Sequence, residues 1–172
     1  MSETVRNAAV DEDSERPSWG WRSFWLPVLV AVLSLVGIGV SAYLSYTYWF
    51  DKSVVCAGLS SCNAVAESDY SHMGPFPVAF FGVLGYAAIL AVAAFWLRVG
   101  DRFGDWPLLA IWGMSVGGVA YSIYLTYVEL FVIDAVCIWC VIQAVVMLCI
   151  FILTTAGVLT MGRQEEYDDE EA

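Results

Sequence analysis

The sequence is short of charge. Only 15% of its 172 residues are Asp, Glu, Lys or Arg, whereas 60% are hydrophobic. An ordinary soluble domain is nearer half apolar and about a quarter charged, so this composition excludes that class. Lipid is the environment that can accept the surplus of apolar residues, and we therefore expect a membrane protein.

Four long stretches contain no Lys, Arg, Asp or Glu at all: residues 25–50, 78–97, 108–127 and 135–159. Each can cross the hydrocarbon core, about 30 Å thick, because a helix needs about 20 residues to do so. A charge near the bilayer centre would be costly. The first stretch is too long, and too far from the start, to be a cleaved signal peptide. The predicted fold is all-α, an integral membrane four-helix bundle.

Small residues recur four positions apart in two of these stretches, at Gly37, Ser41 and Ser45 and at Gly113 and Gly117. Such stripes let membrane helices approach one another closely. We expect both stripes to lie at helix contacts within a compact bundle.

Basic residues are scarce, and their placement predicts the orientation. Of the 7 Lys and Arg residues, only Lys52 falls in the segments 51–77 and 128–136, which join helices at one end. The others are Arg6, Arg16, Arg22, Arg98, Arg102 and Arg163. Because short cytoplasmic loops carry the excess of Lys and Arg, both termini are expected in the cytoplasm and both joining segments outside. The predicted location is the cell membrane, with multiple passes.

Acidic residues gather at the chain ends, and the formal net charge is −11 at pH 7. Acidic tails are usually solvated and disordered rather than binding sites. We therefore expect acidic cytoplasmic tails over residues 1–24 and 161–172, and a transmembrane domain over 25–160.

Four of the five cysteines lie in or next to the outward segments: Cys56 and Cys62 in the first, and Cys137 and Cys140 just after the second, at the expected start of the fourth helix. The non-cytoplasmic side permits disulfides. At i and i+3 the second pair shares one helix face, and the first turn of a helix favours a thiolate. Such a pair is both nucleophile and leaving group in disulfide exchange, although Asp134 would oppose the thiolate.

Two other uses of the four cysteines remain open. One is a static disulfide that caps the fourth helix. The other is a zinc site, although Cys56 and Cys62 are spaced more widely than usual zinc ligands. Cys149 is expected to be an inert buried thiol, and His72 a structural or solvated residue.

The outward segment 51–77 is too long for a tight connection. We expect a short helix after Cys62, through residues 63–67, and a break at 74–77 whose Pro77 can start the second helix. A cysteine pair on such an element could swing between an external partner and the second pair. The two pairs would then form a relay.

A relay needs an electron acceptor, and a lipid-soluble quinone matches the two electrons of a dithiol at membrane depth. A haem-attachment motif is excluded because Val141, rather than His, follows Cys140. The sequence contains no flavin or nicotinamide fingerprint.

The run YLTYVELFVIDAVCIWC at 124–140 resembles the junction between the third and fourth helices of the vitamin K epoxide reductase family. The order of elements is also similar: a loop cysteine pair, a Gly74-Pro-Phe-Pro77 entry to helix two followed by Phe81-Gly-Val-Leu-Gly-Tyr86, then Cys-x-x-Cys. The resemblance implies a thiol–quinone oxidoreductase with its catalytic domain over 25–160. The acidic excess also resembles proteins of salt-loving archaea.

Carried over by position, the resemblance makes Cys140 the cysteine that meets the quinone. It implies that Cys137 exchanges with Cys62 and that Cys56 faces the redox partner. These four cysteines would be the catalytic residues, and no metal is expected.

The same resemblance implies quinone contacts at Cys140, Val78, Phe81 and Ala144, with menaquinone or a related quinone as acceptor. The family has Asn near the start of helix two and Tyr one turn after the active pair, where this chain has Val78 and Ala144. Reduction of vitamin K epoxide itself is not expected.

Prokaryotic members of the family usually form disulfides in exported proteins through a thioredoxin-like partner. Because the chain stops soon after its fourth helix, that partner is expected to be a separate protein. Membrane lipid and quinone complete the expected partners, and no nucleic acid is among them. A DsbB-type quinone reductase is the nearest alternative, but its Cys-x-x-Cys comes first. A non-enzymatic membrane scaffold with two structural disulfides is the other.

Overall fold

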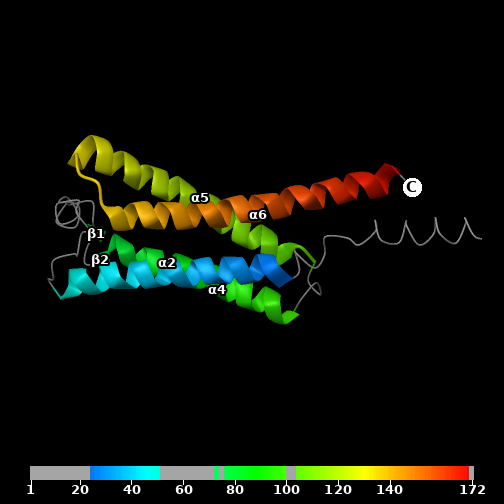
Figure 1. Cartoon of the computed structure of the whole chain (residues 1–172), viewed down its shortest axis with the longest axis horizontal. Coiled ribbons are helices and arrows are strands. Elements are labelled where there is room, and N and C mark those ends of the chain that lie inside the picture. The colour runs from blue at the N-terminus through cyan, green and yellow to red at the C-terminus, as the bar shows by residue number, and fades with distance from the viewer. Residues whose placement is uncertain (1–23, 51–71, 74–75, 100–103, 171–172) are drawn as a thin grey trace, which may run out of the picture.

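The computed structural model describes residues 24–50, 72–73, 76–99 and 104–170. Four long helices dominate it: α2 (Leu26–Trp49), α4 (Val78–Val99), α5 (Trp106–Val128) and α6 (Ile138–Glu170). Successive helices run in opposite directions, and α2 lies beside α4 while α5 lies beside α6 (Figure 1). The prediction of an all-α four-helix bundle is confirmed.

Each of the four helices is long and apolar enough to cross a membrane, over Leu26–Trp49, Val78–Val99, Trp106–Ile133 and Ile138–Met161. Proline lies in the first turn of α2 and of α5, where its missing N–H leaves no helical bond unmade. Large apolar side chains such as Leu35, Leu148 and Ile152 remain exposed on the outside of the bundle. That outer surface suits lipid.

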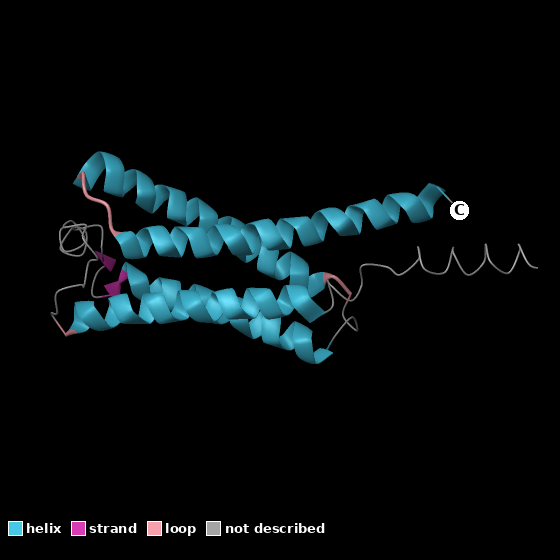
Figure 2. Ribbon diagram, viewed as in Figure 1, coloured by secondary structure: helices cyan, strands magenta, loops and turns pink. Residues whose placement is uncertain are grey.

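Two short strands precede α4, β1 (His72–Met73) and β2 (Phe76–Pro77), and they pair antiparallel with His72 opposite Pro77. Figure 2 shows them at the end of the bundle where α4 begins. This small ladder was not predicted. The expected short helix over 63–67 lies outside the described residues.

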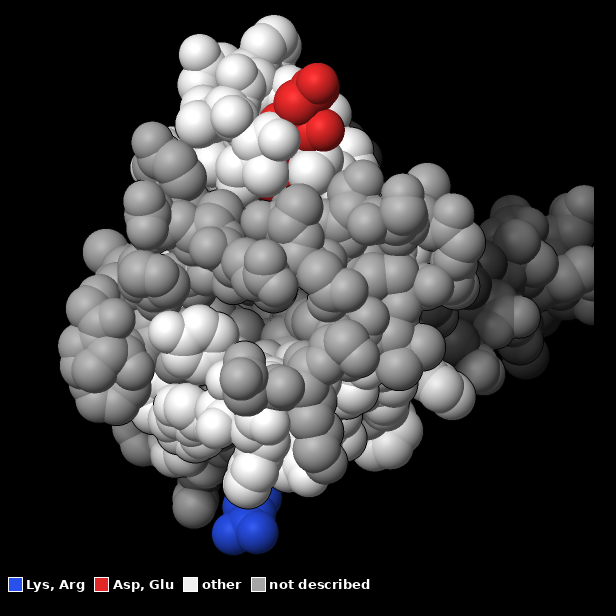
Figure 3. Space-filling model, turned by 90° about the vertical axis from the view of Figure 1, so that its left-hand side faces the viewer, with Lys and Arg blue, Asp and Glu red and all other residues white. Residues whose placement is uncertain are grey.

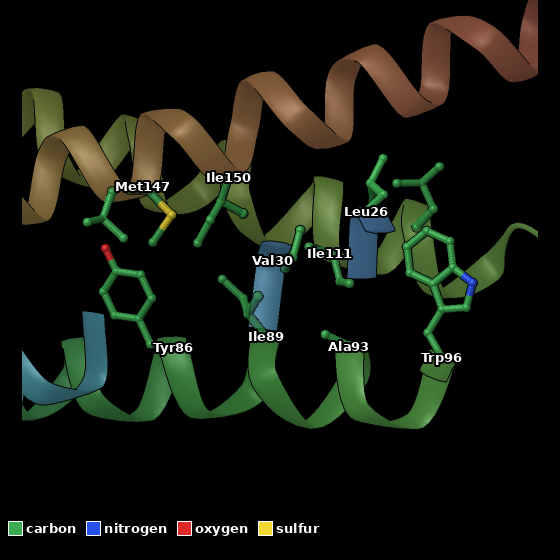
Figure 4. Packing of buried hydrophobic residues seen from close by; sticks show 11 residues of the cluster. Leu26, Val30, Tyr86, Ile89, Ala93, Trp96, Ile111, Met147 and Ile150 are labelled. Atoms are coloured by element: carbon green, nitrogen blue, oxygen red, sulfur yellow. The ribbon is translucent and has the colours of Figure 1, made fainter. Parts of the chain in front are cut away.

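Apolar side chains from all four helices fill the middle of the bundle. Figure 4 shows Ile89 of α4 directed toward Val30 of α2, with Ile111 of α5 and Ile150 of α6 close by. Because lipid is as apolar as these side chains, their close packing stabilises the bundle through van der Waals contact. The core therefore fixes how the helices are rotated.

The stripe of small residues on α2 lies at a helix contact, as expected. A Cβ added at Gly37 would lie 2.6 Å from the Tyr86 ring of α4, so α4 packs directly on that glycine. The expectation for α5 is wrong, since an added Cβ at Gly113 or Gly117 would meet nothing within 4 Å. The close contact on α5 is at Gly118, against Met147 of α6.

The last helix is longer than predicted. Helix α6 continues to Glu170, past the expected end at residue 159 and beyond the other helices (Figure 1). Residues 163–170 contain no Gly or Pro, and their Glu, Gln and Arg favour helix. The change from apolar to acidic composition therefore does not end the helix.

Candidate active site

The connection between α5 and α6 is built by an unusual turn. Helix α5 runs directly into the π-helical turn η4 (Glu129–Ile133), and Asp134 then adopts a left-handed conformation with φ 52°. Asp tolerates that region better than most residues. The Glu129 carbonyl accepts hydrogen bonds from the N–H groups of Asp134 and, at 3.0 Å, of Ala135. These bonds reverse the chain and fix Glu129 against the start of α6.

Cys137 lies just before α6 rather than inside it. Its carbonyl accepts the Val141 N–H at 3.1 Å, the first bond of the helix, while Cys140 lies within the first turn. The predicted start of this helix at residue 135 is therefore too early. The N–H groups of the first turn still point toward the cysteine pair.

The two cysteines are free thiols that lie near the C-terminal end of α2. Cys137 is only 4% exposed and packs on Tyr43 and Leu44, while Cys140 is partly buried. The Tyr43 ring lies 5.0 Å, centroid to centroid, from the ring of Trp139, one of the two residues between the cysteines. Helix α2 and the aromatic residue of Cys-x-x-Cys thus cover Cys137.

Hydrogen bonds lower the pKa of the Cys137 thiol from 9.0 to about 6. The main cause is the hydrogen bond from the Cys140 side chain, and the backbone N–H groups of Cys140 and Trp139 add to it. Burial and the nearby Glu129 carboxylate oppose the shift. These hydrogen bonds favour the thiolate form of Cys137, and their main source is the Cys140 side chain rather than the helix start alone. The opposing acid is Glu129, rather than the expected Asp134.

Glu129 is the site residue that sequence reasoning missed. It is 6% exposed, its Oε2 lies 3.5 Å from the Cys137 backbone N, and its carboxylate is hydrogen-bonded to the Cys140 side chain. As part of the expected outward link it resembled an ordinary loop acid. Its position directly after the uncharged stretch 106–128 and shortly before the cysteines could have identified it.

A polar cluster lies one turn further along α6. The Gln143 side-chain amide donates to the Gly37 carbonyl at 3.2 Å and to the Ser41 hydroxyl, and the Tyr86 hydroxyl donates to the Gln143 carbonyl at 3.1 Å. Within the described part of the chain, Gln143 Oε1 and Ser45 Oγ are buried without a hydrogen-bond partner. An unpaired buried polar atom costs about 1–3 kcal/mol, so an acceptor is left available beside the thiols.

The remaining cysteines and predicted quinone contacts lie on α4, on α6 or outside the described residues. Val78 begins α4 and is partly buried, Phe81 is 45% exposed, and Ala144 is partly buried on α6. Cys56 and Cys62 lie outside the described residues. Cys149 is partly buried in α6 rather than fully buried.

Seen end-on from the α6 start, the described surface is almost entirely uncharged (Figure 3). Acidic atoms are visible at its upper edge, the side where Figure 1 places the end of α5, and basic atoms are visible at its lower edge. Within the described residues, no group of three His, Cys, Asp or Glu could hold a metal ion. The chemistry of the described part of this end rests on its two thiols and the carboxylate beside them.

A comparison with models of known protein families matches residues 28–155 to the vitamin K epoxide reductase family. The match runs from α2 to the middle of α6 and contains both cysteine pairs. It covers most of the chain and rests on the whole helical region rather than on the Cys-x-x-Cys alone.

Proposed function

The chain belongs to the vitamin K epoxide reductase family, and from that premise we propose that it carries electrons from a thioredoxin-like protein to a quinone. Members of this family are membrane oxidoreductases that link thiol–disulfide exchange to quinones. The family thus supplies the class of reaction. The order of the cysteines, the partner and the quinone are the finer parts of the proposal.

In the proposed relay each step moves two electrons. The partner's dithiol reduces the Cys56–Cys62 disulfide and becomes a disulfide itself. Cys62 then attacks Cys137 of a Cys137–Cys140 disulfide, and Cys56 resolves the mixed disulfide, which leaves Cys137 and Cys140 reduced. The reduced pair re-forms its disulfide while the quinone takes two electrons and two protons to become the quinol.

The observation that carries this proposal is the thiolate of Cys137. Its pKa of about 6 makes Cys137 a good leaving group when Cys56 attacks Cys62. The same thiolate is the nucleophile that closes the disulfide with Cys140. A structural disulfide needs no such adjustment, so the lowered pKa favours turnover over the scaffold alternative.

The polar cluster on α6 suits a quinone head group. Gln143 lies three residues from Cys140, on the same face of the helix. Its unpartnered Oε1 would accept a hydrogen bond from a quinol hydroxyl. With Val78, Phe81 and Ala144 this gives the proposed contact set, and menaquinone or a related quinone is the proposed acceptor.

The proposed location is the cell membrane, with both termini in the cytoplasm and both cysteine pairs outside. Arg98, in the last turn of α4, lies at the end of the bundle opposite Cys137. This placement agrees with a cytoplasmic excess of basic residues. The outer side is also where exported proteins acquire disulfides.

The test supplies the protein, in lipid vesicles, with menaquinone and a reduced thioredoxin-like protein. Quinol formation, followed by the change in quinone absorbance, should require both. A Cys140→Ser variant should be inactive and a Cys149→Ser variant fully active. Absence of quinone-dependent thiol oxidation by the folded wild-type protein would sink the proposal and favour the scaffold.

A further inference from the structure

One carboxylate lies where a membrane bundle rarely tolerates a charge. Glu129 belongs to the apolar span Trp106–Ile133 and is 6% exposed. Ionisable residues within such spans usually serve a function. The only Lys or Arg side chain that the structure describes is that of Arg98, at the opposite end of the bundle. The described part of the chain thus offers Glu129 the two cysteines as partners and no cation.

The Glu129 side chain contacts the two cysteines that react. The Cys140 thiol lies within hydrogen-bonding reach of both the Glu129 carboxylate and the Cys137 sulfur, and its single proton can be donated to either of them. The bond from the Cys137 N–H to Oε2 is long, at 3.5 Å, and therefore weak. The carboxylate is better placed to act on the Cys140 proton than to cap the helix.

The main chain holds the carboxylate there. The Glu129 carbonyl accepts the N–H groups of Asp134 and Ala135, and Asp134 takes up a left-handed conformation to allow it. A left-handed non-glycine residue costs about 1 kcal/mol, and the fold retains this one beside the thiols. The turn thus fixes Glu129 in direct reach of Cys140.

The reaction needs a proton acceptor at this place. When a dithiol gives two electrons to a quinone, both S–H protons leave, one S–S bond forms, and two protons end on the quinol oxygens. Hydrogen bonds lower the pKa of Cys137, so Cys137 loses its proton first. The remaining proton is the one on Cys140.

We propose that Glu129 is a catalytic base that takes this proton from the Cys140 thiol. The S–H bond breaks, an O–H bond forms on the carboxylate, and Cys140 becomes a thiolate. As the Cys137–Cys140 disulfide closes, the electron pair passes to the quinone, Glu129 gives its proton to one quinol oxygen, and water supplies the other. Glu129 ends as a carboxylate. This role rests on the proposed function, because it needs a quinone as acceptor.

The test compares Glu129→Gln with wild type in full-length protein in vesicles. Gln keeps the shape and an oxygen that can accept from Cys137, but it cannot take a proton. Asp134→Asn is the matched control, since Asn tolerates the left-handed region and loses the same charge. We expect Glu129→Gln to reduce quinone about 100-fold more slowly at pH 7, as for loss of a general base. Its rate should recover as pH rises, and the control should match wild type.

A second measurement separates a chemical role from a structural one. Without quinone, reduction of the Cys137–Cys140 disulfide by the partner, followed by thiol alkylation, should proceed at the wild-type rate in Glu129→Gln. Equal loss of both half-reactions at every pH would overturn the proposal in favour of a structural role. Full quinone reduction by the variant would overturn any role. An inactive wild-type protein would instead overturn the proposed function itself.

Discussion

The middle of the bundle and the end that carries Cys137 and Cys140 are stabilised by different kinds of interaction. In the middle, the side chains of Val30, Ile89, Ile111 and Ile150 are buried in an apolar cluster. At the end that carries the cysteines, Cys137 and the Glu129 carboxylate are buried beside the partly buried Cys140, and a strained turn holds them. Packing in the middle sets the positions of the helices. Those positions in turn determine the burial and the hydrogen bonds of the cysteines.

The largest expected effect is at the end of the bundle that carries Cys137 and Cys140. Cys140→Ser should abolish quinone reduction, by a factor of at least about 1,000, because no dithiol remains to be oxidised. In this variant the Cys137 thiolate can attack Cys62 of the Cys56–Cys62 disulfide and release Cys56 as a thiolate, and no Cys140 is present to break the resulting Cys62–Cys137 disulfide. That species should be visible on a non-reducing gel and be lost on adding Cys62→Ser. A scaffold would accumulate no such species.

The pH dependence of Cys137 is the second test. Alkylation requires the thiolate, and the pKa of about 6 predicts that its rate falls only below about pH 6. Cys140→Ala removes the main cause of the shift, so the midpoint should move up toward the ordinary value of 9.0. The measurement is the alkylation rate of Cys137, followed by mass spectrometry of the labelled peptide, in proteins that keep or lack Cys140 and whose Cys56, Cys62 and Cys149 are replaced by Ser. An unchanged midpoint in Cys140→Ala would mean that the Cys140 side chain does not lower the pKa of Cys137.

In the middle of the bundle, we expect a substitution to change the stability of the protein rather than its activity. Gly37→Ala places a Cβ 2.6 Å from the Tyr86 ring, and overpacking of this kind costs about 1–3 kcal/mol. Gly113→Ala is the matched control, because its Cβ meets nothing and alanine favours helix. Thermal unfolding in detergent should rank Gly37→Ala below wild type and the control at or above it. Equal unfolding temperatures would mean that α2 and α4 are not in close contact at Gly37.

The smallest expected effect lies between the two regions, at Gln143. Gln143→Leu removes the bonds to Gly37 and Ser41 and the free Oε1 acceptor. A hydrogen bond in a membrane bundle contributes about 0.6 kcal/mol, so we expect about a threefold rise in KM for quinone with kcat little changed. Steady-state rates at varied quinone test this, with Gln143→Glu as a second variant that keeps an acceptor. A fall in kcat alone would remove Gln143 from the proposed quinone contacts.

Sequence reasoning failed at particular residues for identifiable reasons. The stripe at Gly113 and Gly117 has the spacing of a helix contact, yet the contact is at Gly118. Spacing shows that residues share a face, but not which face meets a neighbour. Glu129 was missed because the π-helical turn carries α5 through the segment expected to be an open link.

The sequence by itself determined the four helices, their alternation and the placement of a cysteine pair at the start of the last one. These follow from apolar length, charge and residue spacing, which are local properties of the chain. Only the tertiary structure decided that Tyr43 covers Cys137 and that Glu129 lies against Cys140. Burial and hydrogen bonding depend on how separate helices are rotated against one another, and packing in the middle of the bundle sets that rotation.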